Sequence, residues 1–275
     1  MVRFCASIGI LFSFAAVILL VFGEISQISS DLMPRRLRLV HIDTSGLGVA
    51  LAAASKSSGL TISGASNNFS DIYNKDAVGE GYFVKSTNES RHDGLRKGYE
   101  WGLWSYCSTN GDLGAARSYC VERSIDGPRF QPAQVLLEDI PTEYSDLLKQ
   151  VLPENIFTAD DYLGEYTRGA TYVTMVGALS TAIAALIGLF ARRFAFILAT
   201  LFSIIAFLGL TAGNVIYTVI FNRAIDAINQ ATVGGVDVGI TLSYGNALWI
   251  MWAATALIFA SILPFAFSCC TARSA

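Results

Sequence analysis

The chain has 275 residues, of which 53% are hydrophobic and 15% are charged, and its formal net charge is −3. Soluble domains carry about 25% charged residues, so this composition excludes an ordinary soluble globular protein. The apolar residues gather in four blocks, and a helix needs roughly 20 such residues to cross about 30 Å of hydrocarbon. We therefore predict a multi-pass membrane protein with four transmembrane helices.

The first apolar block, Met1 to Gly23, contains a single charge, Arg3. Its apolar stretch from Phe4 to Phe22 is longer than the roughly 7–15 residues found in the apolar region of a signal peptide. No small-x-small cleavage motif follows before Glu24. The block is therefore predicted to be a retained first transmembrane helix over residues 1–24, rather than a cleaved signal peptide.

The polar segment of residues 25–170 follows this helix and has the features of a separate α+β domain. Runs of aromatic and β-branched residues predict a small sheet, with strands over Leu37–Asp43, Glu80–Ser86, Tyr99–Cys107 and Arg117–Arg123. The stretch Ser55–Asn74 is rich in Ser, Gly and Asn, which predicts a loop.

Helices are also expected in this segment. Ser45–Ala54 is small and apolar, and it predicts either a short helix capped by Thr44 or a buried run. An amphipathic helix with Pro141 near its start and Pro153 past its end is indicated by apolar residues at i, i+3, i+4 and i+7, namely Tyr144, Leu147, Leu148 and Val151.

Charges are unevenly distributed along the same segment. The stretch from Glu138 to Glu165 contains eight acids and only Lys149 as a base. This pattern is typical of a solvated face, and a partner surface or repulsion from anionic lipid headgroups is the alternative. Three arginines near the first span form either a contact with lipid phosphates or a simple flank: Arg35, Arg36 and Arg38.

Three further apolar blocks predict transmembrane helices over residues 171–191, 194–222 and 244–268, with a short loop of residues 223–243 and a tail of residues 269–275. Cytoplasmic connections are enriched in Lys and Arg. Arginines precede the first span, join the second to the third and follow the fourth, at Arg3, Arg192, Arg193 and Arg273. Both termini are therefore expected in the cytoplasm, and residues 25–170 and 223–243 on the outer side of the membrane.

The predicted spans contain pairs of small residues at close spacing, which let helix backbones approach one another. These pairs serve either packing within one bundle or association between copies, and they are Gly9/Ser13, Ala178/Ala182, Ala184/Gly188 and Gly209/Gly213. Asn214 is the strongly polar side chain well inside a span. An unsatisfied amide is costly in lipid, so Asn214 is expected to form a hydrogen bond to another helix.

The five cysteines divide between the two sides of the membrane. Cys107 and Cys120 lie in the segment assigned outside, where disulfides persist, and a bridge between them would contribute about 3 kcal/mol. A tight turn at Asn110-Gly111 would instead place Cys107 opposite Gly114, so the bridge requires a longer loop; we favour the bridge.

The remaining cysteines, Cys5, Cys269 and Cys270, lie where spans meet the cytosol, and they are either predicted palmitoylation sites or ordinary small apolar residues. A metal site is not expected, because neither His41 nor His92 neighbours a cysteine and metal sites need ligands at tight spacing.

Two N-glycosylation motifs begin at Asn68 and Asn88. Such motifs are used only outside the cytosol, and both fall in the segment already assigned outside. They are therefore predicted to make the protein a glycoprotein.

One short stretch resembles a known family. A Trp101-Gly102-Leu103-Trp104 run, followed by Cys107 and then Cys120, is similar to the signature of the claudin superfamily, in which this motif lies between the first and second of four spans. The long first loop and the stretch Ile42–Ser45 resemble the fungal PalI-type tetraspanners, which include the eisosome proteins of plasma-membrane furrows. The resemblance implies a fungal plasma-membrane protein with a role in membrane and cell-wall organisation.

The motif tryptophans have two readings. They pack in the core of the small sheet, or they anchor one face of it at the membrane interface, where Trp and Tyr are enriched.

These observations predict a four-helix transmembrane bundle with a large extracellular α+β domain, a small antiparallel sheet plus helices, inserted between the first and second spans. No phosphate loop, nucleophile elbow or intramembrane carboxylate pair is present in the sequence, so neither an enzyme nor a cofactor is expected. The leading hypothesis is a structural, membrane-organising tetraspanner. Its expected partners are lipids, further copies or other membrane proteins, and cell-wall components, but not nucleic acid. The alternative is an accessory subunit of a cell-wall synthase, a channel or a pH-sensing complex.

Overall fold

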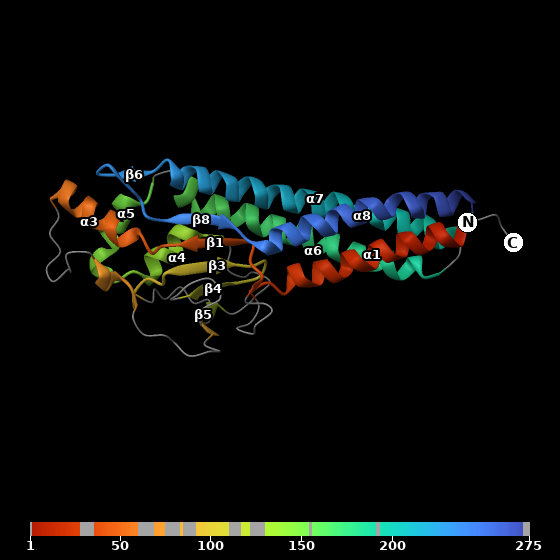
Figure 1. Ribbon diagram of the computed structural model, residues 1–275, viewed down its shortest axis with the longest axis horizontal. Helices are drawn as coiled ribbons and strands as arrows, with labels where there is room; N and C mark the ends of the chain where they lie inside the picture. Colours follow the sequence, from red (N-terminus) through yellow and green to blue (C-terminus); the bar gives the residue numbers. More distant parts are fainter. Residues whose placement is uncertain are drawn as a thin grey trace. The chain divides into compact units, whose positions relative to one another are not determined.

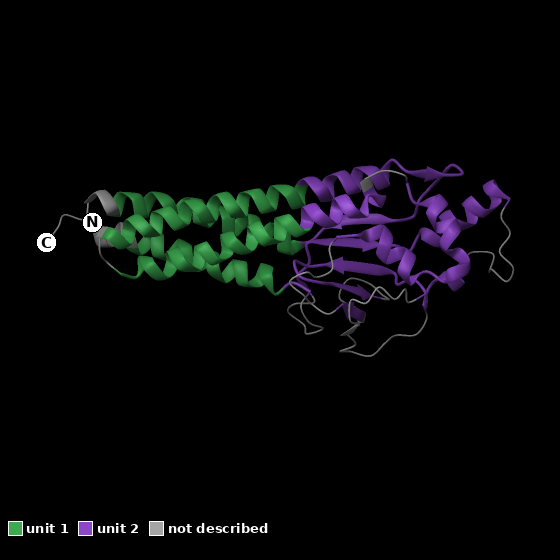
Figure 2. Ribbon diagram, turned by 180° about the vertical axis from the view of Figure 1, so that it is seen from behind, with its two compact units in different colours: residues 1–25, 168–218, 246–275 green, residues 26–167, 219–245 purple. Residues whose placement is uncertain are grey.

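The computed structural model describes residues 2–27, 36–59, 69–74, 83–84, 92–109, 117–121, 130–153, 156–190 and 193–271. The chain divides into two compact units (Figure 2). The helical unit contains Met1–Ile25, Arg168–Thr218 and Asn246–Ala275, and the sheet unit contains Ser26–Thr167 and Val219–Gly245.

Four helices build the helical unit (Figure 1): α1 (Val2–Glu24), α6 (Asp160–Gly188), α7 (Arg193–Asn229) and α8 (Asn246–Thr271). Within the described ranges, these four are long and apolar enough to cross a membrane, as predicted. Helices α6 and α7 have 29 and 37 residues, more than the roughly 20 that a span needs. Residues 160–167 of α6 and 219–229 of α7 belong to the sheet unit.

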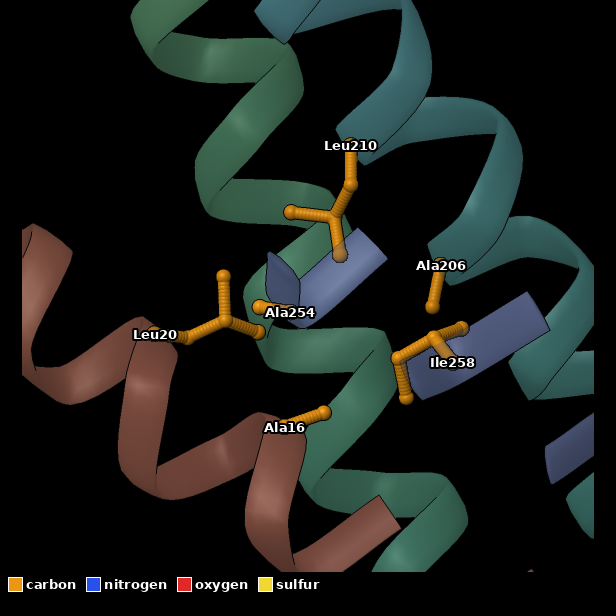
Figure 3. Packing of buried hydrophobic residues seen from close by; sticks show 6 residues of the cluster. All are labelled: Ala16, Leu20, Ala206, Leu210, Ala254 and Ile258. Carbon is orange, nitrogen blue, oxygen red and sulfur yellow. The ribbon is translucent and has the colours of Figure 1, made fainter. Parts of the chain in front are cut away.

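An apolar cluster lies at the centre of the helical unit, where side chains from three helices point toward one another (Figure 3). Its buried members alternate between alanine and a larger residue, and they are Ala16, Leu20, Ala206, Leu210, Ala254 and Ile258. A second cluster joins α7 to α8 through Phe196, Ala199 and Phe265. The alanines leave room for the larger side chains of neighbouring helices.

Glycines bring α6 and α7 into backbone contact. A Cβ atom at Gly177 would lie 2.9 Å from the backbone nitrogen of Leu210, and one at Gly213 would lie 3.2 Å from the carbonyl oxygen of Ala170. A Cβ atom at Gly209 would lie 3.3 Å from the Cα of Gly177. The Gly209/Gly213 pair therefore packs inside the bundle, which is the first of the two alternatives considered from the sequence.

The sheet unit contains a six-stranded sheet. Its order is β2 (Phe83–Val84), β5 (Arg117–Val121), β4 (Tyr106–Thr109), β3 (Gly98–Trp101), β1 (Val40–Asp43) and β8 (Thr241–Tyr244). Neighbouring strands are antiparallel except β2 and β5, which are parallel. The predicted small antiparallel sheet between the first and second spans is confirmed, with one parallel pair at its edge.

Two strand predictions need correction. The segment Tyr99–Cys107 was predicted as one strand, but β3 ends at Trp101 and β4 begins at Tyr106, because the chain reverses at residues 102–105. Strand β8 was not predicted. Its first three residues fall in the predicted short loop of residues 223–243, and its last residue, Tyr244, was assigned to the fourth span. Its four residues pair with β1, which no local pattern indicates. The same connection contains a small hairpin of β6 (Thr232–Val233) and β7 (Val236–Asp237).

Several short helices complete the sheet unit. Helix α3 (Leu47–Ser58) confirms the helical alternative for the small apolar run, but Gly46 is its N-cap, because the hydroxyl of Thr44 donates to the carbonyl of Arg96 instead. The predicted amphipathic helix is η2 (Thr142–Tyr144) followed by α5 (Ser145–Val151), with its apolar residues buried. Helix α4 (Pro132–Asp139) and the short turns η1 (Ser70–Ile72) and η3 (Ile156–Thr158) were not predicted.

Some predicted features lie outside the described residues: the sequon asparagines Asn68 and Asn88, the Asn110-Gly111 turn, and the side chains of Cys5, Cys269 and Cys270.

Candidate functional site: the motif hairpin and its buried polar network

The Trp-Gly-Leu-Trp motif forms the turn of a hairpin. Strands β3 and β4 pair Trp101 with Tyr106 and Glu100 with Cys107. Between them, the backbone nitrogen of Gly102 donates to the carbonyl oxygen of Ser105 over 2.8 Å, which closes a four-residue loop. Trp101 therefore ends β3, and Gly102, Leu103 and Trp104 lie in the tight connection that leads to β4.

A disulfide joins Cys107 to Cys120. The two residues lie directly opposite each other on β4 and β5, and both are buried. This register excludes the alternative in which Cys107 faces Gly114. The predicted bridge is confirmed, and it links two strands of the sheet across the loop that joins them.

The motif turn packs against Ser26 and Gln27, the residues that follow the last turn of α1 in the chain. The backbone nitrogen of Leu103 donates to the hydroxyl of Ser26 over 3.3 Å, and the hydroxyl of Ser105 donates to the carbonyl of Gln27. A Cβ atom at position 102 would overlap the carbonyl oxygen of Ser26. Only glycine allows this close approach, which gives the motif glycine a physical role.

Glu100 is the centre of a buried polar network. Its carboxylate accepts hydrogen bonds from Arg38 Nη1 over 2.9 Å and from Gln27 Nε2 over 3.2 Å, and Gln27 Nε2 also donates to the carbonyl of Leu37 over 2.7 Å. The Glu100 side chain is 2% exposed and that of Arg38 20% exposed. Removing one partner of a fully buried ion pair typically costs about 3–5 kcal/mol, and the cost should be lower here because the guanidinium of Arg38 is partly exposed. The network holds Gln27 and Arg38 against Glu100 of β3.

His41 borders this network, with its Nδ1 atom 3.8 Å from Glu100 Oε1. Burial lowers the pKa of His41, and the positive charge of Arg38 adds to this effect, while the carboxylates of Glu100 and Asp43 oppose it. The fold therefore favours the neutral imidazole.

The motif tryptophan Trp101 lies in an aromatic core. Its ring is stacked on Tyr106 with 5.2 Å between centroids and meets Phe130 edge-on at 5.3 Å. Phe130 in turn contacts Phe221 of α7 at 5.1 Å. Trp101 is 2% exposed, so the core reading holds for this residue and the interface reading is wrong for it. Trp104 in the turn is only half-buried.

A second buried carboxylate ties α4 to the sheet. Asp139 accepts hydrogen bonds from the hydroxyls of Tyr99 and Tyr119 over 2.6 and 2.7 Å. Burial and the nearby Asp139 raise the pKa of Tyr99 well above its usual value. The backbone nitrogens of His92 and Gly94 also donate to carbonyls at the end of α4. These bonds hold a helix across the strands that carry the motif.

The helical unit contains its own polar contacts between helices. Asn214 Nδ2 of α7 donates to Thr255 Oγ1 of α8 over 2.9 Å, a bond of the kind expected for Asn214. Trp252 Nε1 donates to Thr218 Oγ1 over 3.2 Å.

Sequence reasoning missed several residues of the network: Gln27, Glu100, Phe130, Asp139 and Phe221. A signal existed for Glu100, because a lone carboxylate inside an aromatic strand needs a buried partner. No local pattern indicates that Phe130 and Phe221 meet, since they are distant in the sequence.

The contacts of the motif residues are with other parts of the sheet unit. In the described part of the chain, no three His, Cys, Asp or Glu side chains lie close enough to hold a metal ion. The motif residues instead contribute a disulfide, a turn closed by a backbone hydrogen bond and a stacked aromatic core.

Comparison with known families identifies the chain. The model of the SUR7/PalI family matches residues 5–263, which include most of every transmembrane-length helix and the whole sheet unit. No curated protein matches the chain. The hairpin and its disulfide are also consistent with the claudin resemblance. The chain is therefore a multi-pass membrane protein that belongs to the SUR7/PalI family.

Proposed function

We propose that the protein is a structural tetraspanner that organises an eisosome-like domain of a fungal plasma membrane by self-association and by contacts with lipids and the cell wall. The observation that carries this proposal is the inward packing of the motif. Trp101, Gly102 and Cys107 contact the chain itself, which suits a rigid platform better than a reactive site.

The proposed orientation places the sheet unit outside and both termini in the cytoplasm. It is supported by the one-sided arginines, because cytoplasmic connections carry the excess of Lys and Arg, and by the disulfide, because disulfides persist in oxidising compartments. Protease protection of tags at the two termini tests it, and a terminal tag that is cleaved from outside intact cells contradicts it.

Lipid apposition is supported by the helical unit, whose helices expose large apolar side chains, among them Leu11, Leu179, Leu208 and Leu263. Acylation at Cys5, Cys269 or Cys270 would add a sorting signal for ordered lipid, since each buried CH₂ contributes about 0.8 kcal/mol. Hydroxylamine-dependent acyl exchange on the wild type tests this, with a triple Cys→Ser variant as control.

The self-association is tested in native membranes extracted with polymer rather than detergent. Photobleaching steps of a fluorescent full-length fusion count the copies in each particle, and more than one copy is expected. A single copy in a fixed ratio with a synthase, channel or receptor would overturn the proposal and would favour the accessory-subunit alternative.

A further inference from the structure

A groove of about 960 Å³ in the sheet unit is lined by residues of α5, the end of α7 and β6. This volume is within the roughly 300–1,000 Å³ of typical binding pockets. Apolar residues line part of it, including the buried Val151 and Leu152 and the smaller Ala227 and Ala231. The groove thus offers an apolar surface at the edge of the sheet unit.

Two basic side chains border the groove, Arg223 and Lys149. Arg223 is exposed, and within the described ranges it forms no ion pair or hydrogen bond. Lys149 pairs with Asp146 over 3.2 Å, but both side chains are more than half exposed, and such surface pairs contribute little. Asp226 is the one carboxylate in the lining, and it accepts from Asn222. The groove therefore suits an occupant with carboxylates and an apolar or aromatic part.

The first turns of α6 supply that chemistry on a second surface of the same unit, which we call the tyrosine ledge: Asp161, Tyr162, Glu165 and Tyr166. The two tyrosines are 37% and 51% exposed, and their rings lie 4.4 Å apart. Asp161 and Glu165 are exposed beside them. Exposed tyrosines are enriched at protein interfaces, and the flanking carboxylates disfavour an anionic lipid surface.

We infer that the groove of one copy receives the tyrosine ledge of a second copy, with Arg223 and Lys149 opposite Asp161 and Glu165. The inference rests on the proposed self-association and specifies its contact. Ledge and groove share no residue, so the contact is heterologous, and a repeated heterologous contact builds rings or open arrays. Such arrays are what a membrane-organising protein requires.

A charge exchange tests the contact in full-length protein in polymer-extracted native membranes, with photobleaching steps as the readout. Arg223→Glu and Glu165→Arg should each reduce association about tenfold, because like charges would then face each other across the contact. The two changes combined in one chain should restore association, because the pair is re-formed with reversed sign. Lys56→Glu, an exposed charge change on α3 outside the groove, should leave association unchanged.

The outcomes separate this inference from the proposed function. If the wild type has one copy per particle, both the proposed self-association and the ledge-and-groove contact are refuted. If the Arg223→Glu and Glu165→Arg variants each self-associate as well as the wild type does, only the ledge-and-groove contact is refuted. The contact is also refuted if the double variant stays dissociated while its Cys107–Cys120 disulfide forms normally, or if the single variants lose only a bound lipid or another protein.

Discussion

The helical unit and the sheet unit use different contacts to solve the same packing problem. Helices α6 and α7 meet through backbone at Gly177 and Gly213, whereas the sheet unit relies on a disulfide, a stacked aromatic core and the partly buried Arg38–Glu100 pair. Lipid tails are as apolar as leucine, so helices in a membrane gain little from apolar burial and depend on close contact. A domain in water gains from apolar burial, and its buried polar groups must be paired.

The largest expected effect is that of removing the disulfide, which should destabilise the sheet unit and leave the helical unit unchanged. Replacing Cys107 and Cys120 together by alanine should destabilise the sheet unit by about 3 kcal/mol, because the unfolded loop regains its freedom. The helical unit should keep its helix content, since it contains neither residue. Pulse proteolysis of the sheet unit and far-UV circular dichroism of the whole protein measure the two effects. An unchanged cleavage rate of the sheet unit would contradict the assigned role of the bridge.

A matched glycine pair tests close packing in the helical unit. Gly213→Ala should cost about 1–3 kcal/mol, because its Cβ atom would overlap Thr174 Oγ1 and press on the Ala170 carbonyl. Gly169→Ala on α6 meets no atom within 4 Å, so it should be neutral or stabilising by up to about 1 kcal/mol through helix propensity. Unfolding by SDS in mixed micelles compares them. Equal stabilities of the two variants would mean that backbone contact does not hold α6 to α7.

A smaller effect is expected for the polar bond in the helical unit. Asn214→Leu removes the donor to Thr255, and such bonds between membrane helices average about 0.6 kcal/mol. The amide oxygen of Asn214 is buried and has no partner among the described residues, so its removal relieves a penalty. The same SDS titration should therefore show a loss below about 1 kcal/mol. A loss of several kcal/mol would show that polar bonds, not glycines, dominate this unit.

The sequence predicted what depends on local composition. Four apolar blocks, the Tyr144–Val151 helix and the Cys107–Cys120 pairing follow from hydrophobicity, periodicity and compartment. Prediction from the sequence failed where contacts between distant segments determine the local structure. The reversal at Gly102 depends on the packing of Ser26, and β8 becomes a strand because β1 offers it an edge.

The candidate site shows the same limit. Trp101 and the cysteines were predicted from the motif, but Glu100 acquires its role through Arg38 and Gln27, which are distant in the chain. A sequence motif identifies the residues that a turn requires, but the partners of a buried charge such as Glu100 are known only from the folded structure.

The smallest effect concerns the one histidine beside the buried network. The pKa of His41 is lowered chiefly by burial, with Arg38 adding to the effect, so the folded protein binds its proton less readily than the unfolded chain, whose His has a pKa of about 6.5. The neutral imidazole of His41 therefore contributes its full share to the free energy of unfolding above about pH 6.5, and this share is lost as the pH falls below that value. Urea unfolding of the sheet unit should show a larger loss of stability between pH 7.5 and 5.5 for the wild type than for His41→Gln. Between pH 7.5 and 8.5 the imidazole is neutral in both states, so the two proteins should change equally. Equal losses on acidification would mean that the charge on His41 does not affect the stability of the sheet unit.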